Sequence, residues 1–471
     1  MIERHEILAL SSELSLEPSV VEKDYVLGWT LAGIYADPVL GPAWVFKGGT
    51  CLKKCFFETY RFSEDLDFTL RDEGHLDETF LRERFAAVSA WVADACGLEL
   101  PVEQLRFEIY RTRRDQPACQ GKLPYRGPLG QGGDLPRIKV DLTADEILVR
   151  PAVSQAVGHP YSDLPEGGFR AHCYDFAELF AEKTRALGER SRPRDLYDVV
   201  NLYRLEDRRP PASEVLAILR EKCRFKGIAL PTFAALAPAE AELRADWEAM
   251  LRHQLQALPP FESYWEPLPE FFDWLASGAT KPRPKAPPLD MGAQVLHLAL
   301  GSLGASGIAH ARELERIRFA AASRLCVDLG YQGSVRRIEP YSLRRSAEGA
   351  VLLMAVRADS GESRSYRVDA IESVAVSNQP FSPRFAVELA SAELAIQPIA
   401  RDSFAASSRP GGRSGHARAS RWPSGPTYVF QCPVCQKKFN RTTFDSKLNA
   451  HKMPAGLPCP GRLGILVTTR P

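Results

Sequence analysis

The stretch WVFKGGTCLKKCFFETYRFSEDLDFTL, Trp44 to Leu70, combines a glycine pair, a helical pattern and two spaced carboxylates in one short unit. Its apolar start stops at Gly48 and Gly49, which predicts a buried strand that ends in a tight turn. Thr50 is expected to cap a helix whose apolar residues then recur at helical spacing. A glycine turn in front of exposed helix amides is suited to binding phosphate oxygens.

The end of the same stretch alternates polar and apolar residues. Asp65, Asp67 and Thr69 fall on alternate positions, so we expect a strand with one buried face and both aspartates on the same side. Two neighbouring carboxylates repel each other unless a cation lies between them, and Mg²⁺ prefers few carboxylates together with phosphate oxygens. An Asp-x-Asp strand can also be only a solvated face. Because the Asp-x-Asp strand follows the glycine pair so closely, we favour a site for metal-assisted phosphoryl transfer over a solvated face.

The runs KGGTCLKK and RFSEDLDF resemble the nucleotidyltransferase motif of the AbiEii/AbiGii toxin family, which lies within the polymerase-β-like nucleotidyltransferase superfamily. The resemblance implies that Gly48, Gly49 and Thr50 hold the triphosphate of a nucleoside triphosphate (NTP), and that Asp65 and Asp67 bind Mg²⁺. It implies transfer of a nucleotide to an RNA, such as a tRNA end, or to a protein. It also implies a cognate antitoxin as a partner.

A third carboxylate is expected on another strand. The run RIKVDLT, Arg137 to Thr143, alternates in the same way and predicts a half-buried strand. The superfamily places a carboxylate on a neighbouring strand, where it completes the metal site and deprotonates the attacking hydroxyl. Asp141 is the best-placed candidate, with an exposed strand-edge aspartate as the alternative.

Two helices are predicted between Tyr174 and Leu205, the first ending near Arg190 because a proline follows. Lys183 falls on or beside the apolar stripe of the first helix, where a lysine needs an anionic partner. The family resemblance implies that Lys183 contacts the triphosphate and that Asp195 supports the site by orienting Lys183 or another group. Asp198 is expected to act as a cap or in a salt bridge.

At 471 residues the chain is long enough for two to four domains, with an ordinary globular composition of 45% hydrophobic and 25% charged residues. We predict an α+β multidomain protein without membrane segments or a secretory pattern, hence a cytoplasmic one. Its ten cysteines do not suggest a disulfide framework. The predicted parts are a nucleotidyltransferase domain with a helical region (1–280), a proline-rich linker (281–290), a second domain (291–390), a disordered basic linker (391–426) and a zinc-binding module (427–471).

The second domain contains short strand patterns separated by glycine turns, which predicts a small antiparallel barrel. The runs RRIEPYSLRR, SRSYRVDAIESV and PFSPRF resemble a WYL domain, an SH3-like barrel, although Val351, Leu352 and Leu353 stand where that family has Trp-Tyr-Leu. The resemblance implies a basic surface for nucleic acid or nucleotide-like ligands. Its candidates, which could equally form a solvated barrel face, are Arg344, Arg345, Arg364 and Arg367.

The C-terminal 71 residues hold twelve Lys and Arg against two Asp, so affinity for nucleic acid through bulk charge belongs there. Two thiols with Cys-x-x-Cys spacing and a later His and Cys predict a zinc-ribbon-like site for structural Zn²⁺. These ligands are Cys432, Cys435, His451 and Cys459. Basic residues interleaved with phenylalanines suit phosphate contact and base stacking, and the candidates are Lys437, Lys438 and Arg441.

These observations support two classes of function. The first is a Mg²⁺-dependent nucleotidyltransferase toxin whose accessory modules sense nucleic acid or a ligand. The second is a non-catalytic regulator, in which a decayed transferase domain binds nucleotide and the two accessory modules act on nucleic acid. Incorporation of labelled nucleotide distinguishes them.

Overall fold

The computed structural model describes residues 1–57, 60–130, 133–278, 296–298, 310–346, 349–390, 394–398, 427–432, 434–435, 437–441 and 465–470. The chain divides into two compact units, Met1–Phe404 and Ala405–Pro471. The predicted linker 281–290 and residues 399–426 of the predicted basic linker lie outside the described residues. None of the described helices has the length and apolar character needed to cross a membrane.

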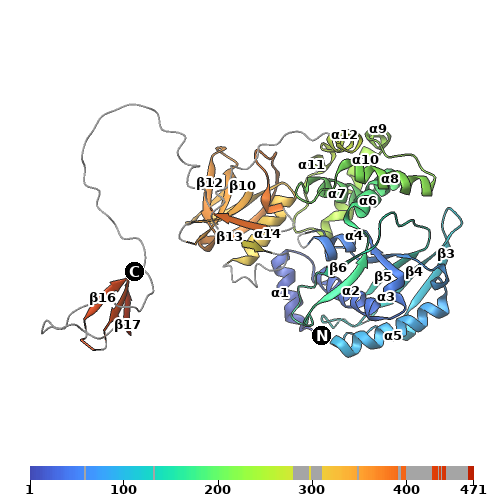
Figure 1. The fold of residues 1–471 in the computed structure, drawn as a ribbon, viewed down its shortest axis with the longest axis horizontal. Helices are drawn as coiled ribbons and strands as arrows, with labels where there is room; N and C mark the ends of the chain where they lie inside the picture. The colour runs from blue at the N-terminus through green and yellow to red at the C-terminus, as the bar shows by residue number, and fades with distance from the viewer. Residues whose placement is uncertain are drawn as a thin grey trace. The chain divides into compact units, whose positions relative to one another are not determined.

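A seven-stranded mixed sheet forms the base of the first unit, with strand order β3-β4-β5-β2-β1-β7-β6 (Figure 1). The central strand β2 pairs antiparallel with β1 and parallel with β5. On the other side of β1, β7 pairs in parallel. The strands are β1 (Trp44–Lys47), β2 (Asp65–Leu70), β3 (Arg106–Arg111), β4 (Pro117–Pro124), β5 (Arg137–Thr143), β6 (Val153–Val157) and β7 (Phe169–Cys173). The strand predictions for β1, β2 and β5 are therefore confirmed.

Helices from the N-terminal third of the chain pack against the sheet. Helix α2 is buried along most of its length because it contacts the sheet as well as α5. The N-terminal elements are α1 (Arg4–Leu14), α2 (Pro18–Ala36), α3 (Leu40–Ala43), α4 (Gly48–Cys51), the π-helical turn η1 (Leu52–Phe56) and α5 (Glu78–Cys96). The π-helical turn continues α4 with wider turns, so the segment after the glycine pair is helical as predicted, with a different period.

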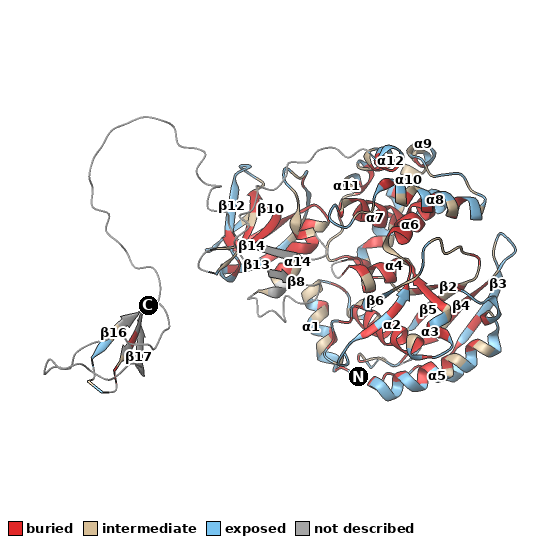
Figure 2. Cartoon of the chain, viewed as in Figure 1, coloured by how far each residue is buried: buried red, intermediate tan, exposed pale blue. Residues whose placement is uncertain are grey.

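A helical layer follows the sheet in the chain, and Figure 2 shows its first two helices largely buried. Ser191 adopts a left-handed conformation (φ 46°) that ends α6, and Pro193 takes the first position of α7, where its missing amide hydrogen costs nothing. The layer contains α6 (Phe176–Arg190), α7 (Pro193–Arg204), α8 (Ala212–Lys226), α9 (Phe233–Leu236), α10 (Glu240–Leu251), α11 (Glu262–Trp265) and α12 (Leu268–Ser277). The predicted break between the two helices is confirmed.

The rest of the first unit contains a second, mainly antiparallel sheet beside α14 (Ala311–Ala322). Consecutive pairs give the order β12-β11-β10-β9-β13, and β10 also pairs with β14. The strands are β8 (Leu296–Leu298), β9 (Leu325–Tyr331), β10 (Ser334–Arg345), β11 (Val351–Arg357), β12 (Ser363–Arg367), β13 (Ile371–Pro380) and β14 (Leu394–Pro398). The predicted barrel is wrong for the described strands, because β12 and β13 form no pair that would close it.

Helix α14 also contacts the N-terminal helices. Arg316 donates two hydrogen bonds to the carbonyl oxygen of Glu13 at the end of α1, of 2.9 Å from Nε and 2.6 Å from Nη2. A third bond, of 3.3 Å, goes from Arg316 Nη1 to the carbonyl oxygen of Val374 in β13. One arginine thus joins α1 to the second sheet.

The second unit contains a small antiparallel sheet of order β16-β15-β17 in its described residues. Its strands are β15 (Thr427–Gln431), β16 (Lys438–Arg441) and β17 (Ile465–Arg470). The hairpin between β15 and β16 holds the Cys-x-x-Cys sequence, and the amide of Cys432 donates a 3.0 Å hydrogen bond to the carbonyl of Lys437 across it.

Candidate active site

The glycine turn lies directly against the first candidate metal ligand. Gly48 has φ +84°, a conformation that side chains disfavour, and a Cβ atom there would lie 2.1 Å from Asp67 Oδ2. Lys47 is the strand partner of Asp67 in the β1–β2 pair, which fixes this approach. The turn therefore requires glycine both for its backbone conformation and for the space that Asp67 occupies.

Thr50 does not cap the helix, in contrast to the prediction. Helix α4 begins two residues earlier, at Gly48, so Thr50 lies inside it. Its Oγ1 instead donates a 2.5 Å hydrogen bond to the carbonyl oxygen of Asp65, which ties the helix to β2. On the other side, a Cβ atom at Gly49 would lie 2.4 Å from Nη2 of Arg61. The turn is thus held between β2 and a buried guanidinium group.

The two central strands bring the three candidate aspartates together. Asp67 lies directly beside Asp141 in the parallel β2–β5 pair, and Asp65 precedes it on the same face. All three are half-buried. Burial and then the Asp141 carboxylate raise the pKa of Asp67 to about 6, against the opposing effect of the Lys47 and Lys183 ammonium groups. Burial is also the main cause that raises the pKa of Asp65.

This carboxylate set fits a Mg²⁺ ion. A divalent cation would offset both the burial and the Asp141 repulsion that raise the pKa of Asp67, and Mg²⁺ is commonly held by one or two carboxylates plus phosphate oxygens. Gln120 Nε2 donates a 3.1 Å hydrogen bond to Asp141 Oδ1 and so orients that side chain. Within the described ranges the three aspartates do not form a group whose oxygens all lie within 4.8 Å of one another. The carboxylates would therefore have to move closer together for all three to bind one ion.

Lys183 of α6 is buried and lies between two aspartates of α7. Its Nζ is 2.7 Å from Asp198 Oδ2 and 3.7 Å from Asp195 Oδ1. Asp195 itself accepts two hydrogen bonds from Arg190, of 2.7 and 2.9 Å. Asp198 is thus the nearer partner of Lys183, and the salt bridge expected for Asp198 is confirmed.

Asp198 is the centre of a buried ion cluster that the sequence interpretation missed. Arg61 donates to both of its oxygens, at 2.7 and 2.8 Å, and the Tyr60 hydroxyl donates at 2.8 Å. Arg61, whose charge is the main cause, together with Lys183, lowers the pKa of Asp198 despite its burial. The available signal was Arg61 itself, a charged residue within the aromatic run FFETYRF. This cluster links the Gly49 turn to Lys183.

A second buried charge network lies between α6, α8 and the segment after β5. Lys222 Nζ is 2.9 Å from Glu178 Oε1 and 3.3 Å from Glu182 Oε2. Arg185, with Lys222 adding to its effect, holds the pKa of Glu182 well below its usual range although burial opposes this. Lys47 of β1 reaches the same network, 4.0 Å from Glu182. Glu182 and Arg185 are one helical turn apart, but the sequence did not show that Lys47 and Lys222 join them because these lysines are distant in the chain.

The four arginines expected on a basic surface of the second sheet all have partners within the chain. Arg344 is buried and forms a bidentate pair with Glu388, at 2.6 and 2.9 Å. The others are half-buried or exposed. Arg345 donates to the carbonyl of Gly349, Arg364 to Glu362 and Arg367 to Asp369.

The candidate residues of the tail are described only in part. Cys432 is buried and Cys435 half-buried. Lys437 and Lys438 are exposed, and Arg441 ends β16. The other two expected zinc ligands, His451 and Cys459, lie outside the described residues.

Comparison with known proteins identifies the family of the chain. Residues 29–277 match the family model "Nucleotidyl transferase AbiEii toxin, Type IV TA system". Among solved structures, the nucleotidyltransferase toxin MenT4 of Mycobacterium tuberculosis H37Rv is similar, with 19% identity, a TM-score of 0.37, and coverage of 59% of this chain and 90% of that one. No curated protein matches the chain. The matched range spans more than half of the sequence and includes the glycine turn, the three aspartates and Lys183, and the chain belongs to the AbiEii family of nucleotidyltransferase toxins of type IV toxin–antitoxin systems.

Proposed function

We propose that this chain transfers a nucleoside monophosphate from an NTP to a hydroxyl group of an RNA, such as a tRNA end, or of a protein. The observation that carries the proposal is the position of Gly48 against Asp67, with Asp141 beside Asp67 on the next strand. The glycine turn is suited to phosphate oxygens, and the carboxylates to the metal that accompanies them.

The proposed roles follow from these positions. Asp65, Asp67 and Asp141 would hold Mg²⁺, which when bound would neutralise charge on the phosphates as pyrophosphate leaves. Asp141 would also accept the proton of the attacking hydroxyl, a role that its pairing with Asp67 in the β2–β5 register supports. The backbone of Gly48, Gly49 and Thr50 would contact the triphosphate.

Lys183 would neutralise phosphate charge, and Asp195 would hold Lys183 in position. Lys183 is near enough to Asp67 to oppose the rise of its pKa, which supports a role in neutralising phosphate charge. Asp195, 3.7 Å from Lys183, would keep this ammonium group and Arg190 in place. As a member of a toxin–antitoxin family, the chain is also proposed to have an antitoxin partner.

The test is incorporation of each α-labelled NTP, with Mg²⁺, into total RNA and total protein. Wild type is compared with Asp65→Ala/Asp67→Ala and with a matched double variant of exposed aspartates, Asp94→Ala/Asp207→Ala. Label that only the first variant loses supports the transferase and identifies its acceptor class. Absence of label with every NTP would reject transfer and favour the non-catalytic regulator.

We further propose that the remaining parts are accessory modules: a WYL-like domain at 291–390 and a zinc-binding module at 427–471. The exposed basic residues Arg364 and Arg367 support the first, although its described strands form an open sheet and not a closed barrel. The hairpin that carries Cys432 and Cys435 supports the second, with His451 and Cys459 as further Zn²⁺ ligands. Metal analysis of the purified protein tests the zinc site. The Zn²⁺ content is expected to fall by one equivalent per chain in Cys432→Ser/Cys435→Ser, and an unchanged Zn²⁺ content in this variant would refute the site.

A further inference from the structure

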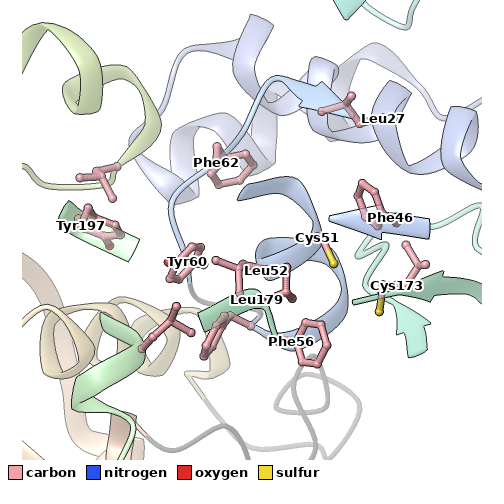
Figure 3. Close-up of a cluster of buried hydrophobic side chains, with 14 of the residues drawn as sticks. Leu27, Phe46, Cys51, Leu52, Phe56, Tyr60, Phe62, Cys173, Leu179 and Tyr197 are labelled. Carbon is pink, nitrogen blue, oxygen red and sulfur yellow. The ribbon is translucent and has the colours of Figure 1, made fainter. Parts of the chain in front are cut away.

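Three cysteines lie close together next to the glycine turn. They have no role in the proposed reaction. Cys51 ends α4, Cys55 lies one turn later in η1, and Cys173 ends β7. Their three sulfur atoms all lie within 4.8 Å of one another. Figure 3 shows Cys51 and Cys173 among buried side chains that include Phe46 and Leu52.

The sheet fixes this meeting point. Cys173 is the parallel partner of Phe46 in β1, the strand that runs directly into the glycine turn. Cys51 and Cys173 are fully buried and Cys55 is half-buried. In the described part of the chain, this is the one group of three or more His, Cys, Asp or Glu side chains whose ligand atoms come so close.

The spacing is near that of a metal–thiolate centre. Zn–S bonds of about 2.3 Å place the sulfur atoms of a tetrahedral or trigonal site about 3.8–4.0 Å apart. Side-chain shifts of less than about 1 Å would therefore bring the three atoms onto one ion. Thiolates select soft ions such as Zn²⁺ or Cd²⁺ over Mg²⁺, so this site would not compete with the aspartates for metal.

We propose that Cys51, Cys55 and Cys173 bind one Zn²⁺-class metal ion, separate from both the aspartate site and the tail cysteines. The three thiols each lose a proton to form M–S bonds, so that three protons leave as one divalent ion enters and the site carries a net charge of minus one. Cys55 is the one half-buried member of the three. The bound ion would join α4, and with it the Gly48–Thr50 turn, to β7.

The test uses the full chain in a Cys432→Ser/Cys435→Ser background, which removes the Cys-x-x-Cys thiols of the tail. Cd²⁺ is titrated and followed by the ultraviolet sulfur-to-cadmium charge-transfer band, with the melting temperature as an independent readout. One equivalent of Cd²⁺ is expected to develop the band and to raise the melting temperature, because the three converging thiols of the folded chain would bind the ion more tightly than the unfolded chain does.

Two variants and one control identify the ligands. Cys55→Ser, at the half-buried position, is expected to weaken Cd²⁺ binding at least about tenfold and to reduce the band. Cys173→Ala tests the buried ligand in the same way, while Cys223→Ser, which changes a buried thiol of α8 outside the cluster, should leave binding unchanged. The absence of a stoichiometric band, or a band that both cluster variants retain, would overturn the proposal.

Discussion

The Lys183 ammonium group lies 2.7 Å from Asp198 Oδ2, and both side chains are buried. The same carboxylate accepts two hydrogen bonds from Arg61, and Asp195, 3.7 Å from Lys183, also accepts two from Arg190, so three cations share two anions. An NTP phosphate near Lys183 would supply the missing negative charge. The arrangement thus leaves one excess positive charge beside the carboxylate-lined phosphate site.

Replacement of Asp198 by Asn should destabilise the fold because it leaves Arg61 buried without its anion and removes the nearer anion of Lys183. Loss of one partner of a buried ion pair costs on the order of 3–5 kcal/mol. The free energy of unfolding from urea titration measures this loss. Asp207→Asn, an exposed change just after α7, should remain within about 0.5 kcal/mol of wild type. Equal stability of the two variants would contradict the role assigned to Asp198.

Asp67→Asn should stabilise the fold while abolishing nucleotide transfer. The pKa of Asp67 is raised to about 6, so the folded chain holds this proton more tightly than the unfolded chain. The carboxylate therefore lowers stability progressively as pH rises from about 4 to about 6. With allowance for solvent screening, the Asn variant should gain on the order of 1–2 kcal/mol above about pH 7 and almost nothing near pH 4. Urea titrations without divalent ions check this, and a gain confined to acid pH would be the wrong sign.

Gly48→Ala should impair activity more than its effect on stability explains. Alanine at a positive φ costs about 1 kcal/mol at most sites, and at Gly48 its Cβ would also displace Asp67. Gly227 provides the matched control, since it has φ +66° and a Cβ atom added there would meet no neighbouring atom within 4 Å. We expect Gly48→Ala to lower kcat/KM at least about 100-fold, because displacement of a catalytic group by about 1 Å has that effect. Gly227→Ala should leave kcat/KM near wild type, and equal activity in the two variants would exclude the close contact as a requirement.

Nucleic-acid binding should depend on the exposed lysines of the tail. The binding constant for nucleic acid falls as salt rises, and removal of one phosphate contact makes the slope of log K against log salt concentration less steep by about 0.7–0.9. Lys437→Ala/Lys438→Ala should therefore make it less steep by about 1.4–1.8. Filter binding of RNA by the full chain over a range of salt concentrations measures the slope. Arg364→Ala/Arg367→Ala tests the second sheet in parallel. An unchanged slope in the lysine variant would remove the tail from the binding surface.

Local pattern predicted the elements of the site well. The two-residue period identified β2 and β5, and the glycine pair identified the turn between β1 and α4. These features depend on neighbours in the chain, so a single sequence contains them. The N-terminus of α4 was misplaced because Gly48 itself starts the helix, which leaves Thr50 inside it.

Contacts distant in sequence could not be predicted in the same way. Arg61 and Asp198 are 137 positions apart, and only the packing of the helical layer brings them together. The alternation of polar and apolar residues in β12 and β13 correctly indicates strands. It does not indicate whether the sheet closes into a barrel, and the sheet stays open among the described strands. The cysteine cluster depends equally on the parallel alignment of β7 with β1.

The hydrogen bonds of Arg316 all go to backbone carbonyl oxygens, those of Glu13 and Val374 among them. Every amino acid supplies such an oxygen, so substitution of Glu13 or Val374 leaves these acceptors in place. A genetic screen for chains that uncouple the second sheet from α1 would therefore recover changes at Arg316 and few at its partners. The identity of Arg316 alone determines these hydrogen bonds. The amino acids at the end of α1 can therefore change without loss of the bonds.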